Sequence, residues 1–144
     1  MRELPGDVFV AGQLLPEHLT RLAEQGVQAF INNRPPGEHP AQPQTAALRE
    51  AAAASGAEFA DIPMTTRLTP ELIARSEAAF AELPRPIVAF CASGTRSAAL
   101  WAFAHAGRLG VDGVMDALSQ AGFPLDAIRP QIEAHLKRSM SGDG

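Results

Sequence analysis

The run from Ile87 to Phe90 constrains the fold of this chain more strongly than any other segment, because it contains no polar residue. Side chains alternate between the two faces of a β-strand, so an unbroken apolar strand must be covered on both faces. Helices packed above and below a parallel-rich sheet provide such cover. The segment therefore indicates a layered α/β fold that buries this strand.

Other short apolar runs alternate with segments of helical character along the chain. The expected strands are 8–11, 27–31, 58–62 and 87–90, and the expected helices are 16–25, 45–55, 70–83, 97–106, 112–121 and 130–138. Strands separated by helices imply right-handed crossover connections between parallel strands. We therefore predict an α/β fold whose central, parallel-rich sheet has about four to five strands, with helices on both faces.

Length and charge narrow the classes of protein that the chain can represent. Its 144 residues suffice for one ordinary domain, and we expect a single catalytic domain over 1–139 and a disordered tail over 140–144. A net charge of −4 without any run of Lys or Arg argues against a nucleic acid or a membrane surface as partner. The first residues lack the apolar segment of a secretory signal, so we expect the cytoplasm as compartment.

The chain contains one cysteine, which excludes an internal disulfide, and four histidines without metal-ligand spacing. We find no glycine-rich nucleotide-binding motif either. We therefore expect neither a metal nor a cofactor. The cysteine is then either a buried apolar residue or a reactive thiol.

The segment after the apolar strand has the features of an anion-binding loop that leads into a helix. Cys91 comes first, Arg96 and Ser97 stand where the helix begins, and four small residues lie between them: Ala92, Ser93, Gly94 and Thr95. Free N–H groups and the helix dipole at such a junction stabilise negative charge. A thiolate at Cys91 would be favoured there, and the planar Arg96 guanidinium can hold two oxygens of an anion. Ser97 can donate a hydrogen bond to the sulfur or to a leaving group.

A buried, inert cysteine at a strand end is the alternative interpretation. However, Cys91 follows the carboxyl end of its strand, which is where ligands bind in open α/β sheets. We therefore favour a catalytic role for Cys91, Arg96 and Ser97.

The pattern C-x4-R-S after an apolar strand resembles the active-site loop of rhodanese sulfurtransferases. The chain as a whole resembles the phosphatase-like domain of the beta-lactamase hydrolase-like proteins. The matching segments are Ala11-Gly12-Gln13, Ile31 to Pro35 with Gly37 and Glu38, Ile62-Pro63, Ser93 to Ser97 with Trp101, and Ala121-Gly122. In sulfide-oxidising bacteria such a domain can be fused to a persulfide dioxygenase. The resemblance thus implies this enzyme, or another enzyme of sulfide oxidation, as a partner.

The same resemblance implies the fold of the dual-specificity protein tyrosine phosphatases. The chain departs from the phosphatase pattern at two places. Phe90 precedes the cysteine where phosphatases and many members of the family have His, and the loop is one residue shorter than the C-x5-R loop of tyrosine phosphatases.

Arg34 follows the second expected strand, so it should lie at the same sheet edge as Cys91. It is either a second cation near the anion site or a solvated turn residue. Asn33 and Glu38 shape the same loop, and Glu38 is able to pair with Arg34.

Asp61 ends the third expected strand and is the carboxylate best placed to act as a general acid. In dual-specificity phosphatases the acid lies in the following loop, but here that loop, 63–68, contains no carboxylate. We therefore favour a structural role for Asp61. Arg67 in this loop either lines the pocket or is solvated, and Trp101 is expected to pack in the core.

These features leave three functional hypotheses open, of which we favour the first, and the two enzymatic ones have small anionic or thiol substrates. The first is sulfur transfer through a Cys91 persulfide, from thiosulfate or a persulfide to an external thiol or cyanide. The short loop favours it, and so does the absence of a general acid, because sulfite and thiolates leave readily. The second is hydrolysis of phosphomonoesters through phospho-Cys91, and the third is a non-catalytic anion- or thiol-sensing module.

Overall fold

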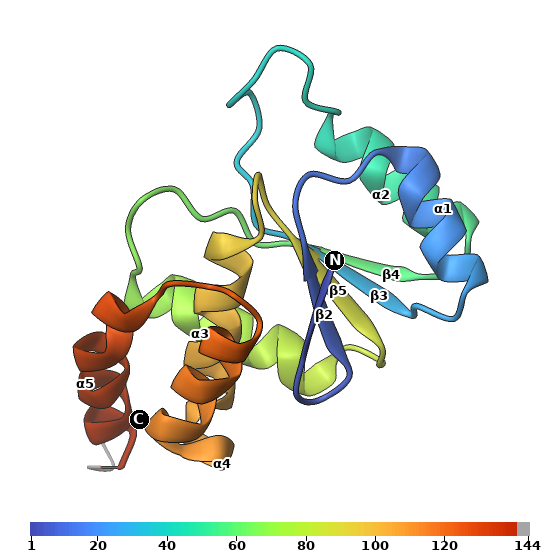
Figure 1. Ribbon diagram of the computed structural model, residues 1–144. Helices are drawn as coiled ribbons and strands as arrows, with labels where there is room; N and C mark the ends of the chain where they lie inside the picture. Colours follow the sequence, from blue (N-terminus) through green and yellow to red (C-terminus); the bar gives the residue numbers. More distant parts are fainter. Residues whose placement is uncertain (141–144) are drawn as a thin grey trace.

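The computed structural model describes residues 1–140, which form one five-stranded sheet with helices on both faces (Figure 1). The predicted fold class is confirmed. The strands are β1 (Arg2–Leu4), β2 (Val8–Ala11), β3 (Ala29–Asn32), β4 (Glu58–Asp61) and β5 (Ile87–Phe90). The helices are α1 (Pro16–Glu24), α2 (Thr45–Ala54), α3 (Pro70–Glu82), α4 (Thr95–Gln120) and α5 (Arg129–Met140), with a 3-10 turn at Asp126–Ile128.

The strands lie in the order β1-β2-β5-β3-β4, so the wholly apolar strand β5 is central. Strands β2, β5, β3 and β4 are parallel, and β1 joins the edge antiparallel to β2. Phe90 is in register with Ala11 on one side and with Asn32 on the other. The loops that leave β2, β3 and β5 therefore begin side by side at one edge of the sheet.

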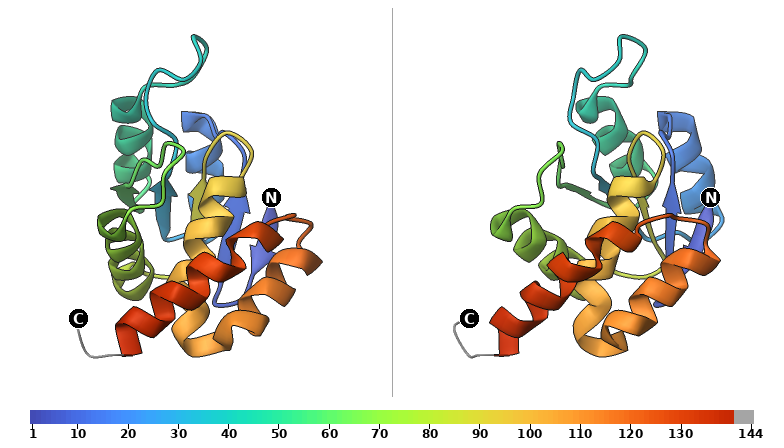
Figure 2. Two further views of the ribbon diagram at one scale, coloured as in Figure 1. Left: turned by 90° about the vertical axis from the view of Figure 1, so that its left-hand side faces the viewer. Right: turned by 60° about the vertical axis from the view of Figure 1, so that its left-hand side comes forward.

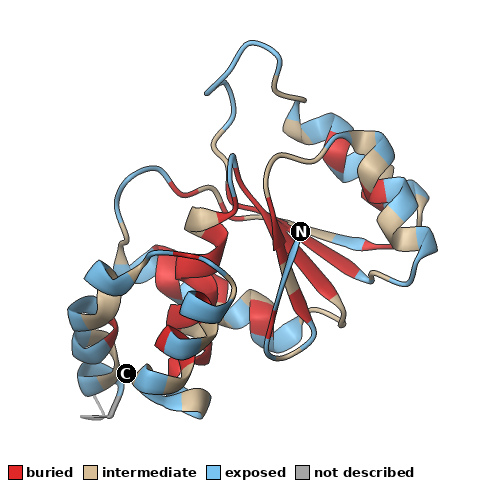
Figure 3. Ribbon diagram, in the orientation of Figure 1, coloured by how far each residue is buried: buried red, intermediate tan, exposed pale blue. Residues whose placement is uncertain are grey.

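Successive side chains of the central strands point to opposite faces of the sheet, and this divides the core into two parts. Val88 and Phe90 of β5 pack against the helices α1 and α2 on one face. Ile87 and Ala89 pack on the opposite face, in the core that α3, α4 and α5 complete. All four side chains are fully buried, as the red strands of Figure 3 illustrate. This two-sided burial explains why the strand has no polar position.

The predicted start of α3 at residue 70 is confirmed. Thr69 caps the helix, because its hydroxyl oxygen accepts a hydrogen bond from the backbone N–H of Leu72 at 3.1 Å. Pro70 is the first helical residue, where its missing N–H costs nothing.

The two helices expected at 97–106 and 112–121 correspond to the two helical parts of α4, which a kink at Gly110 separates. Helix α4 already begins at Thr95 and continues to Gln120, with non-helical angles at Gly110, where φ is +79°. The chain bends at this glycine, and α5 packs back against α4 (Figure 2). Helix α5 includes Met140, which the sequence analysis assigned to the tail, and the other residues of that predicted tail, 141–144, lie outside the described part.

Within residues 1–140, no helix has the length and apolar character needed to cross a bilayer.

Candidate active site

Cys91 directly follows β5 at the edge where three parallel strands end. Its backbone N–H donates to the carbonyl of Ala11 at 3.3 Å, which ties the residue to the end of β2. The residue is 1% exposed. Cys91 therefore lies at the floor of the loop, with its backbone fixed by the sheet.

The residues after Cys91 curl around its sulfur and lead into α4. Gly94 has φ +91°, in the left-handed region that favours glycine, and its N–H donates to Cys91 Sγ at 3.1 Å. The helix begins at the next residue, Thr95, whose hydroxyl lies 3.1 Å from that of Ser93. The predicted arrangement of strand, loop and helix N-terminus is thus present, and the sulfur lies at the positive end of the helix dipole.

Opposing influences act on the Cys91 thiol. Burial raises its pKa, but the backbone N–H of Ser97, that of Ser93, the Ser97 hydroxyl and the backbone N–H of Arg96 together lower it more. The net pKa lies below that of an ordinary thiol, so the thiolate is favoured. Backbone N–H groups, those of Ser97 and Ser93 first, are the largest of the influences that lower this pKa.

Ser97 lies in the first turn of α4 and is completely buried. Among residues 1–140 its hydroxyl has no partner in good hydrogen-bond geometry, although it is near enough to the sulfur to lower the Cys91 pKa. A buried hydroxyl without a fixed partner can turn toward charge that develops on the sulfur or on a bound anion. This position agrees with the donor role predicted for Ser97.

The end of β2 supports the loop through close backbone contacts. The Gln13 N–H donates to the Ala92 carbonyl at 3.3 Å. A Cβ added at Gly12 would approach that carbonyl oxygen to 3.0 Å, and one added at Gly94 would approach the Ala11 carbonyl oxygen to 3.4 Å. The small residues at these two positions therefore let two backbone segments meet beside the sulfur.

Arg96 is held at the rim of the loop by a carboxylate from a distant segment. Its Nη1 donates to Glu38 Oε2 at 2.9 Å and to the Met64 carbonyl at 2.8 Å, and its Nη2 donates to Glu38 Oε1 at 2.9 Å. The Glu38 contacts are the main cause of a raised Arg96 pKa, and negative charge on Cys91 adds to it. The guanidinium is therefore permanently charged and fixed in orientation.

Glu38 also pairs with Arg34, as predicted, through a contact of 3.0 Å to Nε. Arg34 in turn donates from Nη1 to Gln13 Oε1 at 3.1 Å. The hydrogen bond from Arg96 and the pairing with Arg34 lower the Glu38 pKa to about 2, against a smaller opposing effect of burial. Glu38 is thus a permanent anion that links the loop after β3 to Arg96.

Asn33 is buried and acts within the framework. Its side-chain amide donates to the Ile62 carbonyl at 2.8 Å, and its backbone N–H donates to the Phe90 carbonyl at 2.8 Å. The Met64 N–H donates to the Asn33 carbonyl at 2.9 Å. Asn33 therefore positions Met64, whose carbonyl oxygen accepts a hydrogen bond from Arg96.

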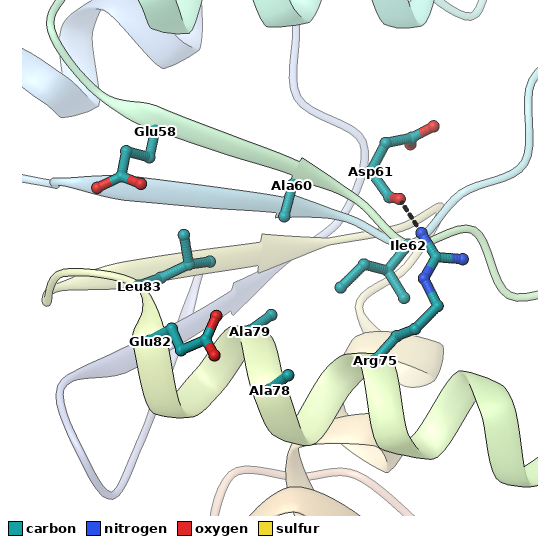
Figure 4. A pocket seen from close by; sticks show the side chains of 9 residues that line it. All are labelled: Glu58, Ala60, Asp61, Ile62, Arg75, Ala78, Ala79, Glu82 and Leu83. Atoms are coloured by element: carbon teal, nitrogen blue, oxygen red, sulfur yellow. Dashed lines mark hydrogen bonds between the residues drawn. The ribbon is translucent and has the colours of Figure 1, made fainter.

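Asp61 lies at the end of β4 and is not among the residues that line the cavity beside Arg96, which is described below. Its carboxylate accepts a hydrogen bond from the Asn32 amide at 2.9 Å, and its backbone carbonyl accepts one from Arg75 at 2.8 Å. Figure 4 shows the latter bond at the edge of a separate hollow of about 390 Å³, with the Asp61 carboxylate pointing away from the other side chains drawn. The placement agrees with a structural role.

A cavity of about 430 Å³ opens beside the rim of the loop, and Arg67 does line it. Thr95 and Arg96, at the start of α4, also line it. The remaining lining residues are Met64, Thr66, Leu68, Ala99, Leu125, Ile128 and Gln131. Trp101 lies outside it, fully buried in the core as predicted, with its Nε1 donating to the Pro5 carbonyl at 3.2 Å.

The contact between Glu38 and Arg96 escaped the sequence analysis because the two residues are 58 positions apart. The sequence did point to Gly37-Glu38, because this segment is among those that match the family. It did not indicate that Glu38 pairs with Arg96. Met64 gave no signal, because it contributes a backbone carbonyl.

Solved structures that share this fold include proteins named as phosphatases. A protein of Neisseria meningitidis Z2491 that is provisionally named a phosphatase superposes with a TM-score of 0.79 and 25% identity, over 93% of this chain and 96% of that one. Tk-PTP in its active form (TM-score 0.66, 15% identity, 95% of each chain) shares the fold, as does the core catalytic domain of a PP-IP phosphatase from S. cerevisiae (TM-score 0.67, 18% identity, 96% of this chain and 89% of that one). The fold and the site together place the chain among the phosphatase-like proteins built on the tyrosine phosphatase fold.

The family can be stated more narrowly. A family model described as beta-lactamase hydrolase-like protein, phosphatase-like domain, matches residues 1–108, and the chain belongs to this family. Beta-lactamase hydrolase-like proteins of Agrobacterium fabrum and Xylella fastidiosa are 32% identical over 127 residues and 33% identical over 120 residues. These alignments cover 86% and 81% of this chain but only 30% and 28% of the relatives, so the chain spans less than a third of their length.

Proposed function

We propose that this chain is a cysteine-dependent phosphatase that hydrolyses phosphomonoesters through a phospho-Cys91 intermediate. The observation that supports this most strongly is the arrangement around the sulfur. A thiol of lowered pKa lies among backbone N–H groups at a helix N-terminus, with a fixed guanidinium at the rim. The family and fold favour this hypothesis over sulfur transfer, which reverses the order that the loop length suggested.

The contacts of Arg96 leave one edge of its guanidinium available. Both Nη1 hydrogens are used, one by Glu38 and one by Met64, while Nη2 gives one hydrogen to Glu38. Nε and the second Nη2 hydrogen donate to no oxygen or nitrogen atom of residues 1–140, although the guanidinium also interacts with the Cys91 side chain through a hydrogen bond and its charge. These two donors form the side of the guanidinium that can hold two oxygens of a phosphoryl group. Glu38 thus occupies one edge and turns the other toward an anion.

The reaction proceeds in two displacements. The Cys91 thiolate attacks phosphorus, the bond from phosphorus to the ester oxygen breaks, and the leaving group departs with the electron pair of that bond. The loop N–H groups and Arg96 stabilise the equatorial oxygens in the transition state. Water then attacks phosphorus, the bond between phosphorus and sulfur breaks, and inorganic phosphate leaves with the thiolate restored.

A phosphate-release assay with p-nitrophenyl phosphate tests this proposal. We expect saturable turnover by the native protein and loss of at least about 10³-fold in the Cys91→Ser variant, whose hydroxyl is a far weaker nucleophile at neutral pH. Thr20→Ser, on the exposed side of α1, is a control that should retain native activity. Equal rates in the native and Cys91→Ser proteins would contradict the proposal.

Sulfur transfer stays as the second candidate because of two particular features. The loop places only four residues between Cys91 and Arg96, and no Asp, Glu or His lines the cavity beside it among the described residues. In this alternative a persulfide on Cys91 passes its sulfur to an external thiol, and a persulfide dioxygenase is the proposed partner. Incubation with thiosulfate or glutathione persulfide, followed by mass spectrometry of Cys91, tests it.

A further inference from the structure

The cavity beside the loop is lined by apolar, neutral polar and positively charged residues, with no acidic residue among those described. Its lining combines the apolar side chains of Met64, Leu68, Ala99, Leu125 and Ile128 with neutral polar groups and two arginines. Arg96 is one of these arginines and is already paired with Glu38. Arg67 is the other; it is exposed, and within residues 1–140 it makes no hydrogen bond or ion pair. The cavity therefore offers a positive charge without a partner and an apolar surface, both next to the phosphoryl site.

The described part of the chain offers no proton donor to this cavity. Asp, Glu and His are absent from the residues that line it. Glu38 is near but has a pKa of about 2, so it stays ionised while it holds Arg96. Asp61 belongs to other hollows, and its carboxylate is occupied by Asn32. Within residues 1–140, no carboxyl group or imidazole is therefore placed to protonate a leaving group in the cavity.

We infer that Arg67 receives the leaving group as an anion and restricts the enzyme to phosphoryl compounds with a weakly basic leaving oxygen on an apolar body, such as aryl phosphates. Here a cation replaces the proton donor. As the bond from phosphorus to oxygen breaks, its electron pair stays on the departing oxygen, and the Arg67 guanidinium stabilises that charge. The apolar residues contact the body of the leaving group. This inference rests on the proposed phosphatase function and adds a substrate class and a further catalytic residue.

A series of substituted phenyl phosphates and one alkyl phosphate, glycerol phosphate, provides the test. The quantity compared is kcat/KM against the pKa of the leaving hydroxyl. For the native protein we expect a steep decline, with glycerol phosphate at least about 10²-fold below p-nitrophenyl phosphate, the factor that a missing general acid costs.

Variants of Arg67 separate catalysis from structure. Arg67→Ala should lower kcat/KM by about tenfold for p-nitrophenyl phosphate and by up to about 10²-fold for phenyl phosphate, because the more basic oxygen needs the cation more. Arg67→Lys should recover part of this loss. The decay of phospho-Cys91 in a single turnover should not change, because the leaving group has gone by then. Arg21→Ala removes an exposed arginine from α1, which packs on the opposite face of the sheet, and should behave like the native protein.

Two results would overturn the inference while the phosphatase function stands. One is native activity on glycerol phosphate within about tenfold of that on p-nitrophenyl phosphate, which would require a proton donor. The other is an equal loss in Arg67→Ala for every substrate and for phospho-Cys91 decay, which would indicate a structural role. Absence of any phosphate release and of phospho-Cys91 would instead remove the proposed function, and this inference with it.

Discussion

The loop around Cys91 and the cavity beside it differ in how the chain builds them. The loop consists of consecutive residues between a central strand and a long helix, and its functional groups are mostly backbone N–H groups around a buried sulfur. The cavity is open and is built from side chains of segments that are distant in sequence. The loop can therefore fix the chemistry of the nucleophile, while the cavity can vary to select the leaving group. Substitutions in the loop should lower the rate for every substrate. Substitutions in the cavity should mainly affect the step in which the leaving group departs.

Arg96 belongs to both regions, and its replacement should have the largest effect. Arg96→Lys keeps the charge but loses the second donor of the free guanidinium edge. We expect kcat to fall by about 10²–10³-fold for all phosphate esters, as when one donor to the transition state is removed. Steady-state kinetics would show it. Arg34→Lys is the matched control, since within residues 1–140 the Arg34 side chain donates to Glu38 and Gln13 and not to the sulfur loop, and it should lose less than about tenfold.

Gly94→Ala and Gly37→Ala compare the two regions at the level of the backbone. Both glycines have positive φ, +91° and +78°, so each substitution should lower the free energy of unfolding by about 1–2 kcal/mol. A Cβ at Gly37 meets nothing within 4 Å, whereas one at Gly94 approaches the Ala11 carbonyl beside the sulfur. Only Gly94→Ala should therefore also raise the thiol pKa and lower activity.

Chemical denaturation, thiol alkylation against pH and phosphatase assays would measure these effects. If Gly37→Ala raised the thiol pKa as much as Gly94→Ala, the distinction between a self-contained loop and its surroundings would be wrong.

Glu38→Gln should have a smaller effect on rate and a visible effect on acid stability. Its folded pKa of about 2 lies below the ordinary value of 4.5, so the ion pairs stabilise the fold above about pH 4.5. That stabilisation is lost as the pH falls toward 2. Denaturation at pH 7 and pH 3 should show a loss of about 1 kcal/mol for the native protein that Glu38→Gln does not share.

We also expect kcat of Glu38→Gln to fall by about tenfold, because Arg96 loses its fixed orientation. Glu24→Gln, at an exposed position of α1, serves as control for the loss of one carboxylate. A variant with native kcat and an unchanged difference between the two pH values would show that Glu38 does not position Arg96.

Asp61→Asn should have the smallest effect on chemistry. The carboxylate is bound to Asn32 outside the cavity, so the ratio of rates on aryl and alkyl phosphates should change by less than about twofold. Stability should fall by about 1 kcal/mol, because a neutral amide oxygen accepts the hydrogen bond from Asn32 less strongly than a carboxylate oxygen does. A severe and selective loss on alkyl phosphates would identify Asp61 as the general acid after all.

The same contrast between local and distant contacts explains what the sequence could predict. The strand over 87–90 and the loop after it are specified by neighbouring residues, so their structure follows from periodicity and from Gly94. The cap at Thr69 is equally local. The antiparallel strand β1 was missed because it has only three residues, two of them exposed and charged.

Contacts between distant segments were mostly beyond prediction. The pairing of Glu38 with Arg34 was expected because the two residues are four positions apart, but the stronger link from Glu38 to Arg96 spans 58 positions. The cavity wall at Leu125 and Ile128 depends on how the chain bends at Gly110 and returns, and single-sequence patterns do not specify such a bend. Loop length favoured sulfur transfer, whereas the family and the fold favour phosphate chemistry.

The most direct test of the account is the identity of the group that Cys91 carries during turnover. The native protein is mixed with p-nitrophenyl phosphate, quenched within a single turnover, digested and examined by mass spectrometry, and a parallel sample receives glutathione persulfide. We predict a phosphoryl group on the peptide that contains Cys91, absent from the Cys91→Ser variant and lost on a time scale that matches phosphate release. No phosphoryl adduct, together with a sulfur adduct on Cys91 that a thiol removes at a catalytic rate, would contradict the account and establish sulfur transfer.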